Sequence, residues 1–331
     1  MRAWIALAGS GYAFVVLLLS AVHVLAPQRS GILALSEVGA PFLFLLLLPL
    51  VPVALGYIAP RKRSWRRLLR VSLVACLAVA AVRFGPVWLS VPASAAGSPR
   101  ISVTSWNVES GEAAPSAVVA VLRAAPEGIV ALVELSKSQA DAIRADDQLI
   151  RRFPYAELFP RDGSLGMGLL SSYPIVDSGR IADDPPLIWA HLDLGGGQTL
   201  GVVAAHPLPA TMRPPLDYDA SERDAQILAV RSIVDGMLGG PNPLVLAGDF
   251  NVTDREPGYG DLSRGLIDAH LEAGFGPGST WRPDPIKWLP FGVLRIDMVF
   301  GGNGARPIAV AVDCTPRGSD HCLVQAELRL E

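Results

Sequence analysis

The sequence predicts a membrane-anchored α/β protein, and three of its features lead to that prediction. Half of the 331 residues are hydrophobic, the mean hydropathy is +0.37, and the apolar excess lies in the first 92 positions. Beyond them, apolar runs of strand length alternate with segments at helical spacing, which is typical of α/β domains. Polar residues then collect where the expected strands end. The length allows one to three domains.

Three long apolar runs predict three transmembrane helices within residues 1–92, at about 3–25, 32–59 and 71–91. Each run exceeds the roughly 18 residues that cross a bilayer as a helix. A cleavable signal peptide is the alternative for the first run, but it would leave the second and third unexplained. Residues 93–100 are rich in Ser, Pro, Ala and Gly, so we expect a linker there, followed by a second domain at 101–331.

The basic segment RKRSWRRLLR between the second and third runs sets the predicted orientation. It carries six Lys and Arg, and short basic loops stay in the cytoplasm. We therefore expect a multi-pass protein of the cell membrane with a cytoplasmic N-terminus and an extracytoplasmic domain at 101–331. Glu37 and Arg83 interrupt the apolar runs. Glu37 is expected at the interface, and Arg83 is expected to reach the outer face, with a lipid phosphate contact as the alternative.

The charge of the two halves differs in sign. Residues 1–100 hold ten Lys and Arg and one acid, whereas residues 101–331 hold eighteen Lys and Arg and thirty Asp and Glu, a net charge of −12. Proteins that bind long nucleic acids without sequence preference draw most of their affinity from a basic surface. The acidic domain therefore argues against long nucleic acid as a partner.

Two cysteines of the outer domain, Cys314 and Cys322, flank a short segment. Outside the cytoplasm a disulfide between them would persist. Because the sequence supplies no geometry, a bridge and two free thiols in the core both remain open.

The outer domain is expected to alternate strands and helices. Strand segments are expected at 100–107, 128–134, 166–176, 186–194, 199–206, 242–253, 294–300 and 321–330, with helices at 114–125, 138–153 and 221–238. Several of these strands are almost wholly apolar, as is usual for strands covered on both faces. Sites of chemistry gather at strand ends and loops. The polar residues placed there are Asn107, Glu134, His206, Asp249, Asn251, Asp297, Asp320 and His321.

Glu134 and Asn107 each follow an apolar strand and together offer oxygen ligands. Oxygen ligands suit a hard cation such as Mg²⁺. The alternatives are a solvated carboxylate at a strand end for Glu134 and a turn amide for Asn107.

Six segments occur in the order SWNVES, ALVELSKSQ, AAHPLPA, AGDFNVT, RIDMVF and GSDHCLV. In that order they resemble the endonuclease/exonuclease/phosphatase superfamily, which includes DNase I-like nucleases, sphingomyelinases and inositol-phosphate 5-phosphatases. The resemblance covers residues 100–331 and implies a four-layer α-β-β-α sandwich of the DNase I-like type. It also implies a metal-dependent hydrolase of phosphate esters or anhydrides that uses Mg²⁺, with Mn²⁺ as the alternative.

The resemblance implies a role for each catalytic candidate. Asp249 resembles the aspartate that orients or deprotonates the attacking water, and Asn251 resembles its partner, which donates to the phosphate. His206 and His321 resemble the two histidines that flank the scissile phosphate and stabilise charge or protonate the leaving oxygen. Asp297 resembles the carboxylate that holds His321 in its useful tautomer.

Further residues carry weaker signals. Asp320 resembles a residue near the metal or one that supports it. Arg223 and Gln226 lie three apart, hence on one face of a helix, and are candidates for substrate binding, with a solvated helix face as the alternative.

The chain departs from DNA-binding members of the superfamily between Asp254 and Asp297, where it has few inserted loops. The segment WRPDPIKWLPFGVLR is aromatic and apolar instead. Its Trp281, a further candidate for substrate binding, either packs in the core with Trp288 and Phe291 or rests with them on the membrane interface, a depth that Trp favours.

The expected substrate follows from placement at a membrane. A lipid-linked phosphate is expected, most simply the polyprenyl (undecaprenyl) pyrophosphate carrier of cell-wall synthesis, with membrane lipids as further partners. The plan also resembles membrane-anchored superfamily members associated with teicoplanin (glycopeptide) resistance. The alternatives are a tethered nuclease, a phospholipid phosphodiesterase, and an inactive sensor that binds lipid or antibiotic. The sequence leaves the oligomeric state and the number of metals open.

Overall fold

The computed structural model describes residues 2–57, 63–89 and 99–331. They fall into two compact units. One unit groups residues 1–89 with 211–220 and 255–257, and the other comprises residues 90–210, 221–254 and 258–331. Most of the expected linker at 93–100 lies outside the described residues, as do residues 61–62 of the basic segment and the end of the third apolar run.

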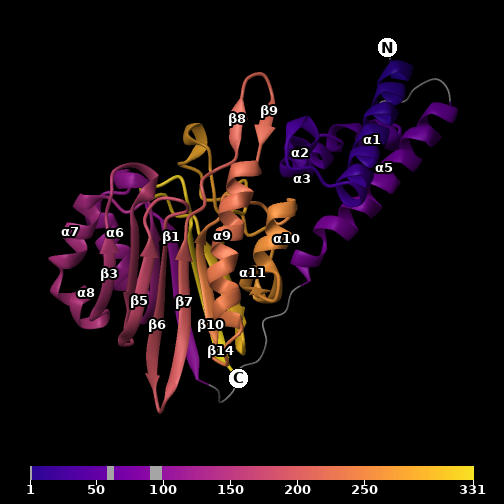
Figure 1. The fold of residues 1–331 in the computed structure, drawn as a ribbon. Helices are drawn as coiled ribbons and strands as arrows, with labels where there is room; N and C mark the ends of the chain where they lie inside the picture. The colour runs from indigo at the N-terminus through magenta and orange to yellow at the C-terminus, as the bar shows by residue number, and fades with distance from the viewer. Residues whose placement is uncertain (1, 58–62, 90–98) are drawn as a thin grey trace. The chain divides into compact units, whose positions relative to one another are not determined.

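The first unit is helical (Figure 1). Its elements are α1 (Arg2–Leu25), α2 (Gly31–Val38), α3 (Ala40–Leu45), the 3₁₀ turn η1 (Leu48–Leu50), α4 (Val51–Leu55), α5 (Arg63–Phe84) and η2 (Pro86–Trp88). The unit also includes the hairpin of β8 (Thr211–Arg213) and β9 (Asp217–Asp219). Ala13 of α1, Leu47 and Cys76 of α5 form one of its small apolar clusters.

The prediction of three transmembrane helices is wrong in number. Among the described residues, one helix is long and apolar enough to cross a membrane, at Trp4–Leu25. The second run is broken: Gly31–Val38 and Ala40–Leu55 are bent by 73° and qualify only if they are counted together. Prolines cannot continue a hydrogen-bonded helix, and Pro41, Pro49 and Pro52 stand in this run. In α5 the first two turns carry arginines, so the apolar part that remains is too short to span.

The two charged residues of the apolar runs pair with each other. Arg83 Nη2 lies 2.5 Å from Glu37 Oε1, and His23 Nδ1 is also in contact with the Glu37 carboxylate. Arg83, which was expected to reach the outer face with a lipid phosphate contact as the alternative, thus has a protein partner. A carboxylate and a guanidinium that neutralise each other are far less costly to bury than either alone.

The second unit contains two six-stranded mixed sheets. The first has the order β13-β14-β1-β2-β4-β3, and the second has the order β11-β12-β10-β7-β6-β5. The first sheet consists of β1 (Arg100–Asn107), β2 (Gly128–Val133), β3 (Tyr155–Phe159), β4 (Met167–Ser171), β13 (Ala305–Asp313) and β14 (Leu323–Leu330). The second consists of β5 (Ile175–Ile181), β6 (Leu187–Gly195), β7 (Gln198–Ala205), β10 (Leu244–Asp249), β11 (Ile267–Asp268) and β12 (Asp297–Gly302).

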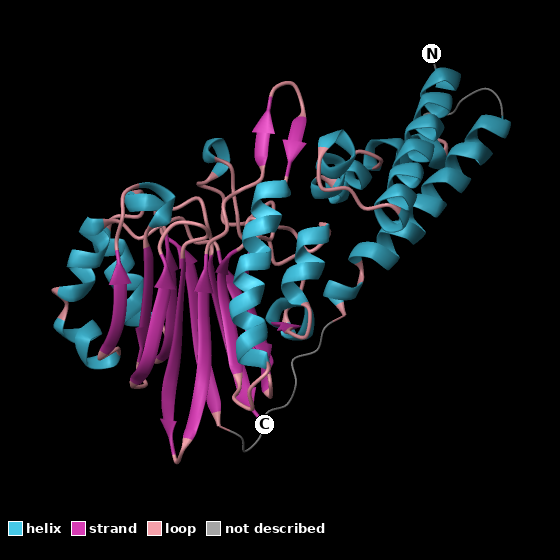
Figure 2. Ribbon diagram, in the orientation of Figure 1, coloured by secondary structure: helices cyan, strands magenta, loops and turns pink. Residues whose placement is uncertain are grey.

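Helices cover the outer face of each sheet (Figure 2). They are α6 (Pro115–Ala124), α7 (Lys137–Arg144), α8 (Asp147–Arg152), α9 (Ser221–Leu238) and α10 (Pro257–Ser263). The helix α11 (Ala269–Ala273) instead contacts β12 of one sheet and β13 of the other, and the 3₁₀ turns are η3 (Glu109–Gly111), η4 (Gly163–Leu165) and η5 (Asp284–Ile286). Val103 and Leu169 of the first sheet share a buried cluster with Val202 and Val245 of the second. The helices α6 to α8 pack on one sheet and α9 on the other. The predicted sandwich of two sheets between helices is confirmed.

Strand direction brings the polar ends together. β1 pairs with β2 in parallel, and β7 pairs with β10 in parallel. Within each pair the carboxyl ends therefore meet at one edge, which carries Asn107 and Glu134 from the first sheet and His206 and Asp249 from the second. The antiparallel pairing of β10 with β12 places Asp249 directly opposite Asp297. These pairings explain why residues far apart in the sequence converge.

Candidate active site

The turn after β10 presents Asp249 and Asn251 to the site. Gly248 has φ +150°, and a Cβ there would lie 2.0 Å from the Ala205 carbonyl oxygen, so only glycine fits beside the neighbouring strand. Asn251 has φ +51°, a left-handed conformation that asparagine tolerates better than most residues. Its backbone N–H donates to Asp249 Oδ1 at 3.0 Å. The motif AGDFN is thus a tight strand-to-loop turn that holds Oδ1 of Asp249 and leaves Oδ2 to contact the other side chains of the site.

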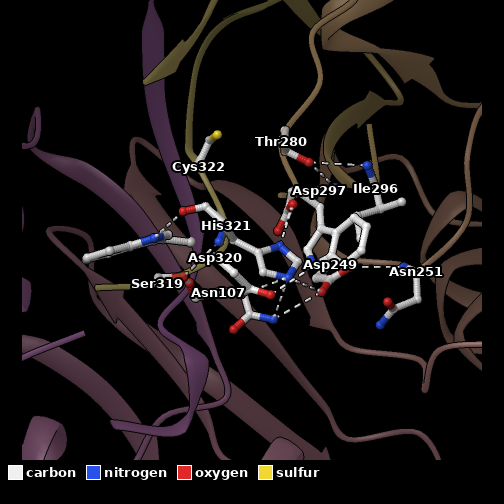
Figure 3. Close-up of polar contacts among 12 residues, drawn as sticks. Asn107, Asp249, Asn251, Thr280, Ile296, Asp297, Ser319, Asp320, His321 and Cys322 are labelled. Atoms are coloured by element: carbon white, nitrogen blue, oxygen red, sulfur yellow. Dashed lines mark hydrogen bonds and ion pairs between the residues drawn. The ribbon is translucent and has the colours of Figure 1, made fainter. Parts of the chain in front are cut away.

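The other carboxylate oxygen of Asp249 lies at the centre of the site (Figure 3). Asn107 Nδ2 donates to Oδ2 at 3.0 Å. His206 Nε2 lies 3.5 Å and His321 Nε2 lies 3.6 Å from the same atom. Burial would raise the pKa of Asp249, but the charges of His321 and His206 outweigh it and hold the pKa below its ordinary value. Asp249 is therefore a carboxylate at neutral pH, with two imidazoles aimed at it.

A carboxylate orients His321. Its Nδ1 lies 2.8 Å from Asp297 Oδ2, and the backbone N–H groups of Asp297 and Ile296 donate to Thr280 Oγ1. Burial opposes the charged imidazole, but Asp297 and Asp249 outweigh it and raise the pKa of His321 to about 10. The predicted pairing of Asp297 with His321 is present in the structure.

A backbone carbonyl orients His206. Its Nδ1 lies 2.9 Å from the Ser164 carbonyl oxygen. Since a carbonyl only accepts, Nδ1 carries the proton and the neutral ring presents Nε2 as an acceptor. Asn251 Nδ2 lies 3.3 Å from that Nε2. Burial works against the cation, but the hydrogen bond and charge of Asp249, followed by the charge of Glu134, raise the pKa of His206.

The candidate metal ligands converge only in part. Asn107 and Glu134 lie within hydrogen-bond distance, but the amide turns its nitrogen toward Glu134 Oε1, at 3.0 Å, while its oxygen accepts the Glu109 N–H. A cation held between the pair would need the amide to turn over. Asp249, Asp297 and His321 form a second, fully buried group whose ligand atoms lie within 4.8 Å of one another.

The donors around the site fit a divalent cation in chemistry. Carboxylates suit Mg²⁺ and Mn²⁺, and imidazole suits softer metals. Asp297 Oδ1 is buried without a hydrogen-bond partner among the described residues, and an uncompensated buried carboxylate oxygen is costly. The residues therefore fit a bound cation without identifying it.

Asp320 lies beside the site and is held by two neighbours. Its Oδ1 lies 3.7 Å from His321 Nε2, and its Oδ2 accepts the Trp281 indole N–H at 2.8 Å. The Asp320 backbone N–H donates to Glu109 Oε2 at 2.7 Å. Trp281, predicted as a substrate contact, thus orients Asp320 through its indole nitrogen, which is the only polar atom of the Trp281 side chain. Glu109 was not predicted, and burial and the charge of Asp320 raise the pKa of its carboxyl group.

Arg223 and Gln226 are buried in α9 rather than solvated. Arg223 Nη1 donates to the Asn251 carbonyl at 2.9 Å, and Gln226 Oε1 accepts the Leu208 N–H at 2.7 Å. Both bonds hold the backbone of loops that follow catalytic strands. The solvated helix face is therefore excluded, and the structure gives these side chains supporting contacts behind Asn251 and His206.

Sequence reasoning missed several residues that hold the His321 segment. Ser319 Oγ donates to the Asn107 carbonyl and accepts the His321 N–H. Thr280 supports Asp297, and Arg282 is fully buried nearby. A lone Ser, Thr or Arg between strands carries no periodic signal. Cys314 and Cys322 form a disulfide, which settles the alternative that the sequence left open.

Comparison with known proteins identifies the domain. The family model described as Endonuclease/Exonuclease/phosphatase family matches residues 104–321. A family protein from Bacteroides thetaiotaomicron has a TM-score of 0.55 and 18% identity, covering 71% of this chain and 99% of that one. Truncated TDP2 from Caenorhabditis elegans has a TM-score of 0.53 and 18% identity, covering 70% and 98%. Sphingomyelinase C from Streptomyces griseocarneus has a TM-score of 0.50 and 19% identity, covering 69% and 99%. No curated protein matches by sequence.

Proposed function

The chain belongs to the endonuclease/exonuclease/phosphatase family, and from that premise we propose that it hydrolyses the phosphate ester or anhydride of a lipid-linked phosphate. The observation that carries the proposed reaction is the position of Asp249, whose Oδ2 faces the Nε2 atoms of both His206 and His321. One ionised carboxylate faces two imidazoles of raised pKa, so a base and the charged His321 lie together in a single buried site.

Each side chain has a distinct part in the proposed reaction. Asp249 orients the attacking water and takes its proton. His321, charged at neutral pH, stabilises the negative charge that develops on the phosphoryl oxygens, while Asp297 keeps its Nδ1 proton in place. Asn251 Nδ2 and His206 Nε2 form the opposite side of the site. A divalent cation, when bound, polarises the phosphoryl group and stabilises the leaving oxygen, and Glu134, Asp320 and Asn107 are its proposed ligands.

The proposed substrate is a polyprenyl pyrophosphate, of which undecaprenyl pyrophosphate is the simplest example. Three observations support a lipid. The helix Trp4–Leu25 is long and apolar enough for an anchor. The domain at 101–331 carries a net charge of −12, which disfavours nucleic acid. Trp288 and Phe291 are 67% and 55% exposed on the loop that follows Trp281, and exposed Trp and Phe favour the membrane interface.

The proposed location is the outer side of the cell membrane. A disulfide persists in oxidising compartments and is rare in the cytoplasm, so the Cys314–Cys322 bridge supports an extracytoplasmic domain. Anchoring, an outward site and a lipid carrier of cell-wall synthesis together make a role in teicoplanin resistance part of the proposal. A phospholipid phosphodiesterase is the second candidate, because the same exposed aromatic residues would serve it.

The test measures hydrolysis by the full-length protein in liposomes, as inorganic phosphate from the pyrophosphate, the released headgroup from the phospholipid and shortened strands from DNA. Undecaprenyl pyrophosphate, a phospholipid and single-stranded DNA are offered separately, with Mg²⁺, Mn²⁺ or EDTA. The Asp249→Ala variant is compared with Asp147→Ala, which removes an exposed aspartate of α8. We expect metal-dependent release from the polyprenyl substrate that only Asp249→Ala abolishes. Cleavage of DNA with both lipids untouched would overturn the proposal, and hydrolysis of the phospholipid alone would select the second candidate.

A further inference from the structure

Arg282 is a fully buried arginine with an unusual set of partners. It is 0% exposed, and the hydrogen bonds of its side chain go to backbone carbonyls. Nε donates to Asp320 O at 3.3 Å, Nη1 donates to Leu289 O at 2.8 Å and Cys314 O at 2.9 Å, and Nη2 donates to Ser319 O at 2.9 Å and His321 O at 3.3 Å.

The number of bonds matches the chemistry of the group. A guanidinium has five N–H donors in a rigid plane, and each of the five hydrogen bonds occupies one of them. Burying a cation is costly unless its donors are satisfied, so these carbonyls must keep their positions for Arg282 to stay inside. The constraint also acts in the other direction, because the rigid fork fixes every carbonyl that it bonds.

Three of the five acceptors belong to consecutive residues of the site, Ser319, Asp320 and His321. Adjacent contacts reinforce this segment. Trp106 Nε1 also donates to the His321 carbonyl, at 3.4 Å, and the Cys322 N–H donates to the carbonyl of Thr280 at 2.7 Å. The disulfide joins Cys322 back to Cys314, whose carbonyl Arg282 also bonds.

The segment at 280–282 therefore touches both partners of the His–carboxylate pair. Thr280 Oγ1 accepts the Asp297 N–H at 3.1 Å, and Arg282 bonds the His321 carbonyl. The Nδ1–Oδ2 distance between the two side chains is 2.8 Å. A movement of the His321 backbone by a fraction of an ångström would lengthen this bond and shift Nε2 relative to Asp249.

We propose that Arg282 is a positioning residue for the reaction. Its guanidinium clamps the backbone of Ser319–His321 so that the His321 imidazole meets Asp297 and Asp249 together. Through Leu289 the same group ties the exposed loop at 284–291 to the clamp, so this loop is mechanically joined to the site. The proposal rests on the proposed role of His321 and does not depend on which phosphorylated compound is the substrate.

The test compares Arg282→Lys and Arg282→Met in the full-length protein. Lysine keeps the buried charge but cannot reproduce the planar fork. Arg231 of α9 is the matched control, since it is 2% exposed and bonds the carbonyl of Leu262 in α10, away from the site. Activity is measured on bis(p-nitrophenyl) phosphate and on undecaprenyl pyrophosphate. We expect kcat to fall about tenfold for Arg282→Lys and about 10²-fold for Arg282→Met with KM nearly unchanged, while Arg231→Lys and Arg231→Met keep the activity.

A double-mutant cycle separates positioning from general stability. In a His321→Ala background, Arg282→Lys should cost little further activity, because the group that it positions is gone. An equal loss of kcat in both backgrounds, or an unchanged kcat in the wild-type background, would overturn the proposal. If Arg282→Met does not fold, Arg282→Lys alone decides.

A readout without substrate keeps the two proposals apart. Backbone amide exchange of the peptide 314–323 should be faster in Arg282→Lys and unchanged in Arg231→Lys. Unchanged exchange in Arg282→Lys would overturn the clamp whatever the substrate. If the wild type hydrolyses bis(p-nitrophenyl) phosphate but leaves undecaprenyl pyrophosphate intact, the proposed function is wrong. The positioning role of Arg282 would then be tested on the diester alone.

Discussion

His206 and His321 approach Asp249 from two sides in the same way, but different groups hold the two rings in place. His321 and His206 place Nε2 at 3.6 and 3.5 Å from the same oxygen of Asp249. Behind His321, Nδ1 meets the Asp297 carboxylate at 2.8 Å, whereas behind His206 it meets the Ser164 carbonyl at 2.9 Å. The two Nε2 atoms therefore lie at almost equal distances from Asp249, whereas the groups that bond the two Nδ1 atoms differ in charge.

The group that bonds Nδ1 of each imidazole therefore decides how strongly the ring holds a second proton. A carboxylate stabilises the imidazolium by a full charge, and the pKa of His321 rises to about 10. A carbonyl offers a dipole alone, so the raised pKa of His206 depends on Asp249 and Glu134 in front of it. Asp249 and Glu134 lie on the side of His206 where the reaction takes place. The protonation of His206 should therefore depend on the charge state of these two groups.

The largest expected effect breaks both sides together. Asp249→Asn removes the charge that both imidazoles face, and with it the proposed base. We expect a loss of kcat of about 10³-fold or more, at the upper end of what acid–base groups contribute. The measurement is phosphate release at saturating substrate, with Asp147→Asn as the control. A variant that keeps a tenth of the activity would show that Asp249 is not the base.

The next effect ranks the two sides. His321→Gln removes the imidazolium that is charged at neutral pH, and we expect kcat to fall about 10²- to 10³-fold. His206→Gln should cost about tenfold, because Asn251 remains on that side. Parallel kinetics at one pH and one metal concentration decide the order. The reverse order would mean that the carbonyl-bound histidine carries the main role.

A smaller effect isolates the partner from the imidazole. Asp297→Asn keeps the shape but removes the charge behind His321, and we expect about a 10- to 10²-fold loss of kcat with little change in KM. In a His321→Gln background the same change should add little, since the two residues act as a unit. Independent losses that multiply would argue that Asp297 acts on its own, for example through a bound cation.

The smallest effect concerns stability without metal. The folded pKa of His321, about 10, exceeds its ordinary value of 6.5. The folded state binds this proton more tightly, so the contribution is full below about pH 6.5 and is lost as the pH rises through about 10. Between about pH 6.5 and 10 the Tm of the wild type in EDTA should therefore fall toward that of His321→Gln. Each kcal/mol lost from the free energy of unfolding lowers the Tm by about 2–4 °C. A Tm difference that stays constant from pH 6.5 to 10 would contradict the raised pKa.

Short patterns in the sequence identified much of the site because strand ends are local features. Asp249 and Asn251 come at the end of an apolar strand, directly after Gly248, where any side chain would clash with the neighbouring strand. His206 and Glu134 end apolar strands in the same way, and parallel pairing brings such ends to one edge of a sheet. The four-layer fold followed from the same alternation together with the resemblance of six ordered segments to one family.

Other features depended on packing between distant segments. The amide nitrogen of Asn107 is held by Glu134 and Asp249, and the burial of Arg223, Gln226 and Arg282 is set by loops that follow other strands. No window of sequence contains both partners of these bonds. The prediction of three transmembrane helices was wrong for a related reason. Hydropathy is summed over a run of residues and does not show whether the run forms one continuous helix.

Local patterns thus predicted which side chains stand at the ends of the strands, since backbone periodicity and steric limits at glycine are properties of neighbouring residues. The reaction that these side chains suit was implied by the resemblance of six ordered segments to one family. The packed structure was needed to show that His206 Nδ1 meets the Ser164 carbonyl, that Cys314 and Cys322 form a disulfide, and that Arg282 bonds five backbone carbonyls. The bonds of His206 and most of those of Arg282 join groups far apart along the chain, and such short-range forces act only after the segments have packed together.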